Sequence, residues 1–356
     1  MQTGRIIFAD ILRIIAIIAV ITLHSTVDLF RSYGSVNIDW WWLGNILNCS
    51  SKWAVPIFVM LSGMLLLDPS KSFSFKSFLN KRLPKILIPL FFWTIFYELY
   101  IVVLINKLNI DLPQLIKNIY TGEVHFHLWF LYMIIGLYLF TPIFRYFIKT
   151  HDEFEIQFFL CIWFIVNGIV NSLDTFFDIQ NGFYLNLFVG FSGYYVLGYY
   201  LNTKLYNRKH RYIAIATLIF SVATSAILIF FLFTNNFASK VDIVIDNISL
   251  FTIINTICIF IIVKSIDWES LLKNNTSILN IIKSLSLSSY GIYLIHIVII
   301  YLLSSNIFIK IFKVGINYKL VHPLVGVPLT VILTVILSYF SVQILKKIKF
   351  ANNIVP

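Results

Sequence analysis

Long apolar stretches recur along the whole chain, and they constrain its fold more than any other feature of the sequence. A helix that spans a bilayer needs about 20 mainly apolar residues. Ten stretches come close to this length, at 6–29, 47–67, 84–105, 127–148, 156–173, 184–201, 211–233, 246–265, 286–304 and 323–345. Only short polar segments separate them, which leaves no room for a soluble domain. We therefore predict one all-α membrane domain over residues 1–356, with about ten transmembrane helices.

The composition agrees with this class and gives an orientation. The chain of 356 residues is 59% hydrophobic and only 12% charged, which excludes a soluble globule and a disordered chain. With the N-terminus placed inside, most of the 27 lysines and arginines fall in cytoplasmic segments. We therefore predict that both termini are cytoplasmic. Anionic membrane lipids account for the net charge of +11 without nucleic acid as a partner.

The first apolar stretch contains polar residues where lipid would favour none. Asp10, Arg13, His24 and Asp28 fall on one side of the predicted helix, with Arg13 and His24 within about 20° of each other and roughly 16 Å apart. Charges at membrane depth normally face a protein interior or a wet cavity. Two interpretations stay open: a functional stripe, or an Asp10–Arg13 pair that snorkels to the cytoplasmic surface while His24 binds a carbonyl. The odd number of cysteines, three, predicts no disulfide framework.

Other polar residues inside or beside the predicted spans are weaker candidates. Ser289, Tyr293 and His296 share one helical face and predict a structural or substrate-positioning role. Glu98 is an acid within the third predicted span, and it is a weak substrate-positioning candidate together with His127 and Trp129.

The fourth predicted span begins among histidines and a tryptophan. His125 and His127 lie beside Trp129 at its outer start, but no cysteine or carboxylate completes a metal site, so we expect no metal. For Trp129 and for 40–42, a place in the aromatic belt at the membrane interface is favoured over sugar stacking.

Five segments resemble the membrane acyltransferase-3 family, and four of them follow the family order. They are RIIFADILRIIAIIAVITLH at 5–24, KWAVPIFVMLSGMLLL at 52–67, FLNKRLPKILIPLFFW at 78–93, HLWFLYMIIGLYLFTP at 127–142 and SSYGIYLIH at 288–296. The fourth is similar to the branch that modifies surface glycans. The resemblance implies a multi-pass enzyme of the bacterial cytoplasmic membrane. Its reaction would move an acyl group, commonly acetyl, from cytoplasmic acyl-coenzyme A to a hydroxyl of an envelope polysaccharide or lipid-linked glycan.

The resemblance also suggests roles for particular residues. His24 would be the general base that activates the hydroxyl, or a nucleophile that carries the acyl group. Arg13, held by Asp10, would bind coenzyme A phosphate or the thioester oxygen. Arg82 and Lys85 would receive the phosphates of acetyl-coenzyme A, unless they are only topology charge.

Two positions depart from the family pattern. Ile14 replaces a glycine, so a neighbouring helix would pack less closely there. Lys85 replaces the second arginine of the family motif and cannot make a bidentate contact with a phosphate.

A transporter or flippase for a lipid-linked glycan is the alternative from another functional class, because buried Arg, His and Glu side chains also line translocation paths. Against it, the sequence has no inverted repeat and no matching pair of Gly/Pro-broken helices. A non-catalytic export partner of a polysaccharide synthase is a further alternative.

Overall fold

The computed structural model describes residues 5–100, 112–123, 125–179, 190–304, 321–349 and 351–356. Within these ranges the regular structure is helical and contains no strand, which confirms the all-α prediction. The α-helices are α1 (Ile7–Arg31), α2 (Ile38–Cys49), α3 (Ala54–Leu66), α4 (Phe75–Arg82), α5 (Pro84–Glu98), α6 (Leu112–Thr121), α7 (Trp129–Thr150), α8 (Glu153–Ile165), α9 (Asn171–Phe177), α10 (Ser192–Thr203), α11 (Arg208–Thr234), α12 (Asp242–Ile245), α13 (Leu250–Lys264), α14 (Trp268–Leu272), α15 (Thr276–Leu303) and α17 (Pro323–Lys347). A π-helical turn, η2 (Val166–Val170), joins α8 to α9, and short 3₁₀ turns are η4 (Ala238–Lys240) and η5 (Ala351–Asn353).

Eight segments of the described chain are long and apolar enough to cross a membrane. They are Ile7–Arg31, Ile38–Leu66, Trp129–Thr150, Glu153–Phe177, Arg208–Thr234, Ala238–Lys264, Thr276–Leu303 and Pro323–Lys347, and each overlaps a predicted span. The other two predicted spans, 84–105 and 184–201, extend into 101–111 and 180–189, which lie outside the described residues. Helices α5 and α10 occupy their described parts. The total of about ten stays a prediction.

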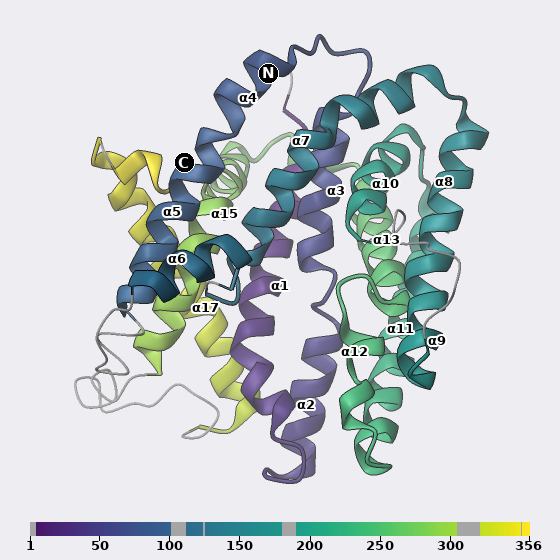
Figure 1. The fold of residues 1–356 in the computed structure, drawn as a ribbon, viewed down its shortest axis with the longest axis vertical. Coiled ribbons are helices and arrows are strands. Elements are labelled where there is room, and N and C mark those ends of the chain that lie inside the picture. The colour runs from purple at the N-terminus through teal and green to yellow at the C-terminus, as the bar shows by residue number, and fades with distance from the viewer. Residues whose placement is uncertain (1–4, 101–111, 124, 180–189, 305–320, 350) are drawn as a thin grey trace.

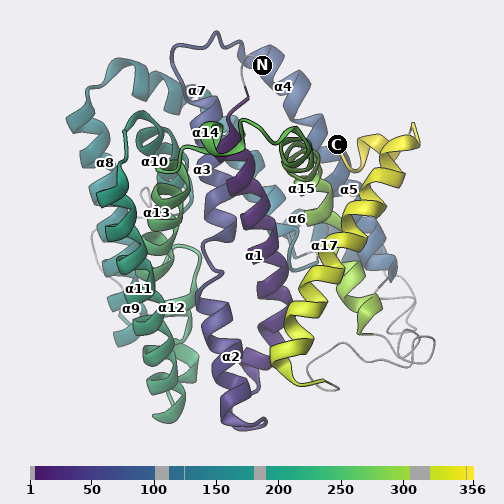
Figure 2. The same ribbon diagram turned by 180° about the vertical axis from the view of Figure 1, so that it is seen from behind.

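Helix α1 runs through the middle of the bundle (Figures 1 and 2). Both ends of the chain lie at one end of the molecule, together with α4 and α14, while α2, α9 and α12 lie toward the other. This arrangement agrees with termini on one side of a membrane. That this side is the cytoplasm stays a prediction from the charge pattern.

Helix α15 packs beside α1 and runs in the same direction. Near the start of α1, Ser286 of α15 donates a hydrogen bond to Asp10 at 2.6 Å. Further along both helices, the ring centroids of His24 and His296 are 5.2 Å apart. Between these points α1 buries small and branched apolar residues, such as Leu12 and Ala16. Asp10, Arg13 and His24 therefore face protein, which removes the cost of placing them in lipid, whereas Asp28, the fourth member of the predicted stripe, is exposed.

Helices α3 and α10 cross with their backbones in contact. A Cβ atom placed on Gly63 would lie 1.8 Å from the carbonyl oxygen of Tyr195, and one on Gly198 would lie 2.0 Å from that of Met60. No real side chain tolerates such distances, so only glycine fits at these two positions. Small residues that allow close approach are typical of helix pairs in membranes.

One of the three consecutive tryptophans contradicts the aromatic-belt prediction. Trp41 is fully buried, and its indole N–H donates to the carbonyl oxygen of Phe30 at 2.8 Å. Its ring also contacts Phe233 of α11, with 5.6 Å between centroids. Trp41 thus anchors α2 to α1 and α11 within the protein and does not face lipid.

Candidate active site

Asp10 is the centre of a polar cluster at the start of α1. It is only 4% exposed, and its carboxylate accepts hydrogen bonds from three side chains. Arg5 Nε lies 2.5 Å from Oδ2, while Arg13 Nη1 and Ser286 Oγ lie 2.9 Å and 2.6 Å from Oδ1. Asp10 therefore holds Arg13, as the sequence suggested, and also ties α1 to α15. Both carboxylate oxygens are engaged in this structural task.

Arg13 faces a cavity of about 520 Å³ that is lined by α1, α3, α4, α5, α7, α15 and α17. Arg82 and Lys85, the two predicted donor-binding residues, line the same cavity from α4 and α5. Lys346 of α17 adds a fourth cation, and its ammonium also donates to the carbonyl oxygen of Leu287 at 3.1 Å. Four positive side chains from four helices thus surround one partly apolar cavity, which we call the cationic cavity.

Lys346 was not predicted as a site residue. In the sequence it belongs to a basic segment at the end of the last apolar stretch, where positive charge is ordinary. No motif distinguishes it from Lys347. Only the packing of α17 against α15 brings it to the cavity.

Arg145 of α7 organises the chain segment at the end of α3, whose last turns line the cavity. Its guanidinium donates to the carbonyl oxygens of Leu66 at 2.5 Å and of Lys71 at 2.7 Å. In the same segment, the Ser70 hydroxyl donates to Asp68 at 2.6 Å and lowers the pKa of that carboxylate. Arg145 therefore stabilises this segment, and these two nitrogen atoms are not available to a ligand.

Tyr293 joins this cavity to a group of histidines. Its ring lines the cavity, and its hydroxyl donates a hydrogen bond to the backbone carbonyl of His127. The backbone carbonyl of Tyr293 itself lies 2.6 Å from Nδ1 of His296. One residue of α15 thus contacts the cavity on one side and two histidines on the other.

Four of the seven histidines of the chain gather in this region. The ring centroid of His296 lies 5.2 Å from that of His24 and 5.4 Å from that of His127. The Nδ1 atoms of His125 and His127 are 2.7 Å apart. His127 and His296 are almost completely buried, and the Nε2 atom of each has no hydrogen-bond partner among the described residues. We call His24, His125, His127 and His296 the histidine cluster.

The sequence predicted three members of the histidine cluster but gave His125 no role. Tyr97, also not predicted, supports His125 from α5: the two rings stack with centroids 4.4 Å apart, and the Tyr97 hydroxyl donates to the carbonyl oxygen of Leu294 at 2.8 Å. The His-x-His spacing was the available signal for His125. No pattern in the sequence marks Tyr97.

Two of the weaker candidates are not brought to the histidine cluster. Glu98, at the end of α5, is partly buried and has no hydrogen bond or ion pair with a described residue. Trp129, at the start of α7, contacts Phe191 with 5.4 Å between ring centroids. Their predicted substrate-positioning roles remain predictions without a structural contact to the histidines.

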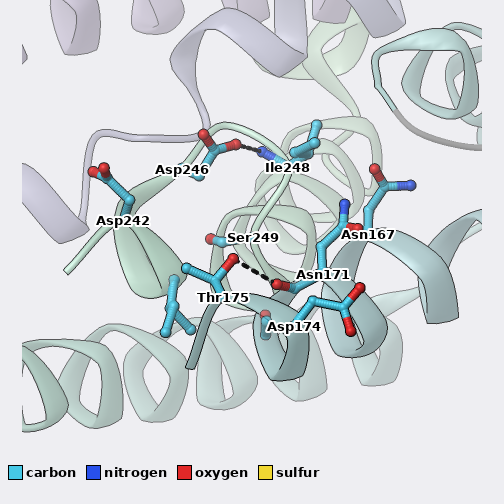
Figure 3. A pocket seen from close by; sticks show the side chains of 10 residues that line it. Asn167, Asn171, Asp174, Thr175, Asp242, Asp246, Ile248 and Ser249 are labelled. Carbon is cyan, nitrogen blue, oxygen red and sulfur yellow. Dashed lines mark hydrogen bonds between the residues drawn. The ribbon is translucent and has the colours of Figure 1, made fainter. Parts of the chain in front are cut away.

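A second cavity, of about 260 Å³, lies between η2 and α9 on one side and α12 and the turn before α13 on the other (Figure 3). Its polar lining includes Asp174, Asp242 and Asp246. Asp246 accepts a hydrogen bond from the backbone of Ile248 at 2.8 Å, so this carboxylate shapes the turn before α13. The cavity contains none of the predicted site residues. The cationic cavity and the histidine cluster are therefore the stronger candidate site.

The described residues contain no group of three or more His, Cys, Asp or Glu side chains that could hold a metal ion. The side chains at the site include imidazole, guanidinium, ammonium, phenol and serine hydroxyl groups. Imidazole suits proton transfer near neutral pH, and the cations suit phosphate or carboxylate.

Comparison with known proteins gives one match. A family model described as an acyltransferase domain matches residues 6–342, nearly the whole chain. The matched range includes every predicted site residue, while Lys346 lies beyond it. No curated protein and no solved structure matches the chain.

Proposed function

The chain belongs to the acyltransferase-3 family and is a multi-pass membrane acyltransferase, and from this premise we propose that it is an O-acyltransferase acting on surface glycans. The donor is acyl-coenzyme A, most simply acetyl-coenzyme A, from the cytoplasm. The acceptor is a hydroxyl of an envelope polysaccharide or a lipid-linked glycan. The membrane is the bacterial cytoplasmic membrane.

One observation carries the proposal: a cavity with four cations shares Tyr293 with the histidine cluster. Coenzyme A carries several phosphate groups and a long neutral arm that ends in the thioester. A partly apolar cavity with Arg13, Arg82, Lys85 and Lys346 in its lining suits such a molecule. The neighbouring imidazoles suit the proton transfer that ester formation requires.

The donor end of the site acts by charge. Arg82 and Lys85 have no ion pair with a described carboxylate, so their positive charges are available to phosphates. Arg13 shares its charge with Asp10 and keeps 27% of its side chain exposed. It stabilises either a phosphate or the negative charge that develops on the thioester oxygen.

At the reaction end, His24 accepts the proton of the acceptor hydroxyl while the hydroxyl oxygen bonds to the acyl carbon. The carbon–sulfur bond breaks, coenzyme A leaves as the thiolate, and the proton from His24 ends on that sulfur. In an alternative route His24 first carries the acyl group; the overall reactants and products are the same, and the same residue is used. Asp10 acts through Arg13 as a positioning residue.

The test is acyl transfer by the purified protein in nanodiscs. Acetyl-coenzyme A and isolated cell-envelope glycans are supplied, free coenzyme A is measured, and the glycans are examined for a mass increase of one acetyl group. We expect both signals with the unmodified protein and neither with His24→Ala. Release of coenzyme A without any glycan mass increase would contradict the acceptor assignment, and absence of both signals would contradict the proposed reaction.

The orientation has its own test, because the donor must reach Arg82 from the cytoplasm. Single cysteines are placed at 76, 208 and 347, and at 36 and 178, in a chain whose three native cysteines are replaced by serine. We expect an impermeant maleimide to label 36 and 178 in intact cells and the other three only after permeabilisation. The predicted outer position 314 lies outside the described residues. Labelling of 208 in intact cells would overturn the orientation.

A further inference from the structure

The tautomer of His296 is fixed by its backbone contact. Its Nδ1 lies 2.6 Å from the carbonyl oxygen of Tyr293, and a carbonyl oxygen can only accept a hydrogen bond. Nδ1 therefore carries the proton. In the neutral ring, Nε2 then has a lone pair and can only accept a hydrogen bond. This buried nitrogen has no partner among the described residues.

The ring of His24 is placed to supply the missing proton donor. The centroids of His24 and His296 are 5.2 Å apart, and the rings are tilted by 39°. The hydrogen-bonded pair of His125 and His127 has a centroid separation of 4.8 Å, so the two separations are similar. His24 itself has no hydrogen bond to a described residue. A small rotation of its ring would bring an N–H group toward Nε2 of His296.

His127 is the other neighbour of His296 and a weaker candidate for this contact. It lies 5.4 Å from His296, with the rings almost perpendicular at 86°. Its Nδ1 is already engaged with His125 at 2.7 Å. The ring of His127 is thus held by another partner, although its Nε2 is unpaired. The ring of His24 packs against Phe126, with 5.1 Å between centroids, and no hydrogen bond to a described residue holds it.

We propose that His296 is the positioning residue for His24: its Nε2 accepts the N–H of the His24 ring and thereby sets which nitrogen of His24 is the free base. This inference rests on the proposed function and deepens it. A general base works best when its second nitrogen is fixed by a hydrogen-bond acceptor, which holds both the tautomer and the ring orientation. In apo structures such contacts are often longer than in the complex with substrate.

The consequence for the reaction is a defined path for one proton. With its N–H directed at His296, His24 presents the lone pair of its other ring nitrogen to the acceptor hydroxyl. After it takes that proton, the doubly protonated ring keeps one N–H on the lone pair of His296. The same proton later leaves with the coenzyme A thiol, so His296 returns unchanged and gains no proton of its own.

The decisive experiment observes the His24 ring directly, by nitrogen-15 NMR of protein with labelled histidine in nanodiscs. Signals of His24 are assigned by their loss in His24→Gln. We expect one tautomer of His24 in the unmodified protein and a mixture of both in His296→Leu, which retains bulk but has no acceptor. His296→Gln can place its side-chain carbonyl near the position of Nε2 and should retain the single tautomer. Identical tautomer populations in the unmodified protein and in His296→Leu would overturn the proposal.

Two matched variants separate this role from packing. His127→Gln alters the other neighbour of His296 and should leave the tautomer of His24 unchanged. His296→Asn retains an amide close to Tyr293 but does not reach the position of Nε2, so it should behave like His296→Leu. A tautomer change in His127→Gln but not in His296→Leu would give the acceptor role to His127 and contradict the proposal.

Kinetics supply the second readout. In His296→Leu and His296→Asn the kcat should fall by about a hundredfold or more while the KM for acyl-coenzyme A is unchanged, and His296→Gln should recover part of the loss. The control is His322→Leu, because His322 contacts Trp40 and does not belong to the histidine cluster. This variant should keep full activity. An unmodified protein that transfers no acyl group would contradict the proposed function, while the NMR result would still decide the role of His296.

Discussion

Two polar groups on α1, one near each end of the helix, differ in how far their hydrogen-bonding atoms are satisfied. Around Asp10, three donors from α1, α15 and the segment before α1 occupy both carboxylate oxygens. Around His24, the buried Nε2 atoms of His127 and His296 lack any partner within the described ranges. The same helix thus carries a saturated cluster and an unsaturated one.

This difference teaches which group holds structure and which is prepared for a substrate. Buried polar atoms in folded proteins are nearly always paired, because an unpaired one costs about 1–3 kcal/mol. A saturated cluster fixes the geometry of its members and has little left to offer a ligand. An unsaturated cluster keeps atoms available, in this case for the proposed contact between His24 and His296 and for the hydrogen bond of His24 with a substrate hydroxyl. We therefore expect variants at the two ends of α1 to fail in different ways.

The largest effect is expected from His24→Gln, at the unsaturated end. Glutamine preserves size and hydrogen bonding but cannot act as a base, so transfer per folded molecule should fall by about a hundredfold to ten-thousandfold. Donor affinity and thermal stability should stay near those of the unmodified protein. Activity is normalised to the folded fraction by size-exclusion chromatography, and full activity in this variant would show that His24 is not the base.

At the saturated end, Asp10→Asn should lower the stability of the protein as well as impair binding of the donor. Removing one partner of a fully buried ion pair costs about 3–5 kcal/mol. The cost here should be smaller, because Arg5 and Arg13 keep 29% and 27% of their side chains exposed. We expect a lower melting temperature together with weaker acyl-coenzyme A binding, measured in nanodiscs. A variant as stable as the unmodified protein would contradict the structural role of Asp10.

A smaller and selective effect is expected at the cavity mouth. Arg82→Ala removes a charge-assisted contact worth about 1.5–3 kcal/mol, so acyl-coenzyme A should bind roughly tenfold to a hundredfold more weakly without loss of fold. Lys85→Arg should tighten binding, since the guanidinium can make two contacts with one phosphate. Calorimetric titration with a non-hydrolysable donor analogue measures both. Unchanged affinity in both variants would indicate that these positive charges only determine the membrane topology.

Ser286→Ala should have the smallest effect, because it removes one of three donors to Asp10 and leaves both ion pairs. A loss of about 0.5–1.5 kcal/mol in stability is expected, with transfer activity close to normal. Thermal unfolding and the coenzyme A release assay check the two parts. A severe loss of activity in this variant would mean that the α1–α15 contact itself takes part in catalysis.

The predictable part of the site follows from one helix and its period. The eleven-residue spacing of Arg13 and His24 placed both on one face, and the structure turns that face toward α15 and the cavity. Local spacing is sufficient here because α1 is regular from Ile7 to Arg31. The ten apolar stretches likewise predicted the helical class, since length and hydropathy are local properties.

What the sequence could not predict depends on contacts between distant segments. His125 joins the histidine cluster through Tyr97 and His127, and Lys346 reaches the cavity only because α17 packs on α15. Trp41 shows the same limit: a run of tryptophans does not reveal which ring faces lipid and which is covered by α11. Helix neighbours decide these placements, and a single sequence does not state which helices are neighbours.

The glycine contact between α3 and α10 has a mechanical consequence for the catalytic cycle. Backbones that touch at Gly63 and at Gly198 are in close van der Waals contact, and separating the two helices would lose that contact, so we expect the pair to move as one unit. Helix α3 forms part of the cationic cavity, so we expect this wall to keep its place when a molecule as large as coenzyme A enters. We expect any widening of the cavity to come from its other walls, such as α4–α5 or α17. The donor would thus enter by movement of one side of the cavity, while the side formed by α3 and α10 stays in place.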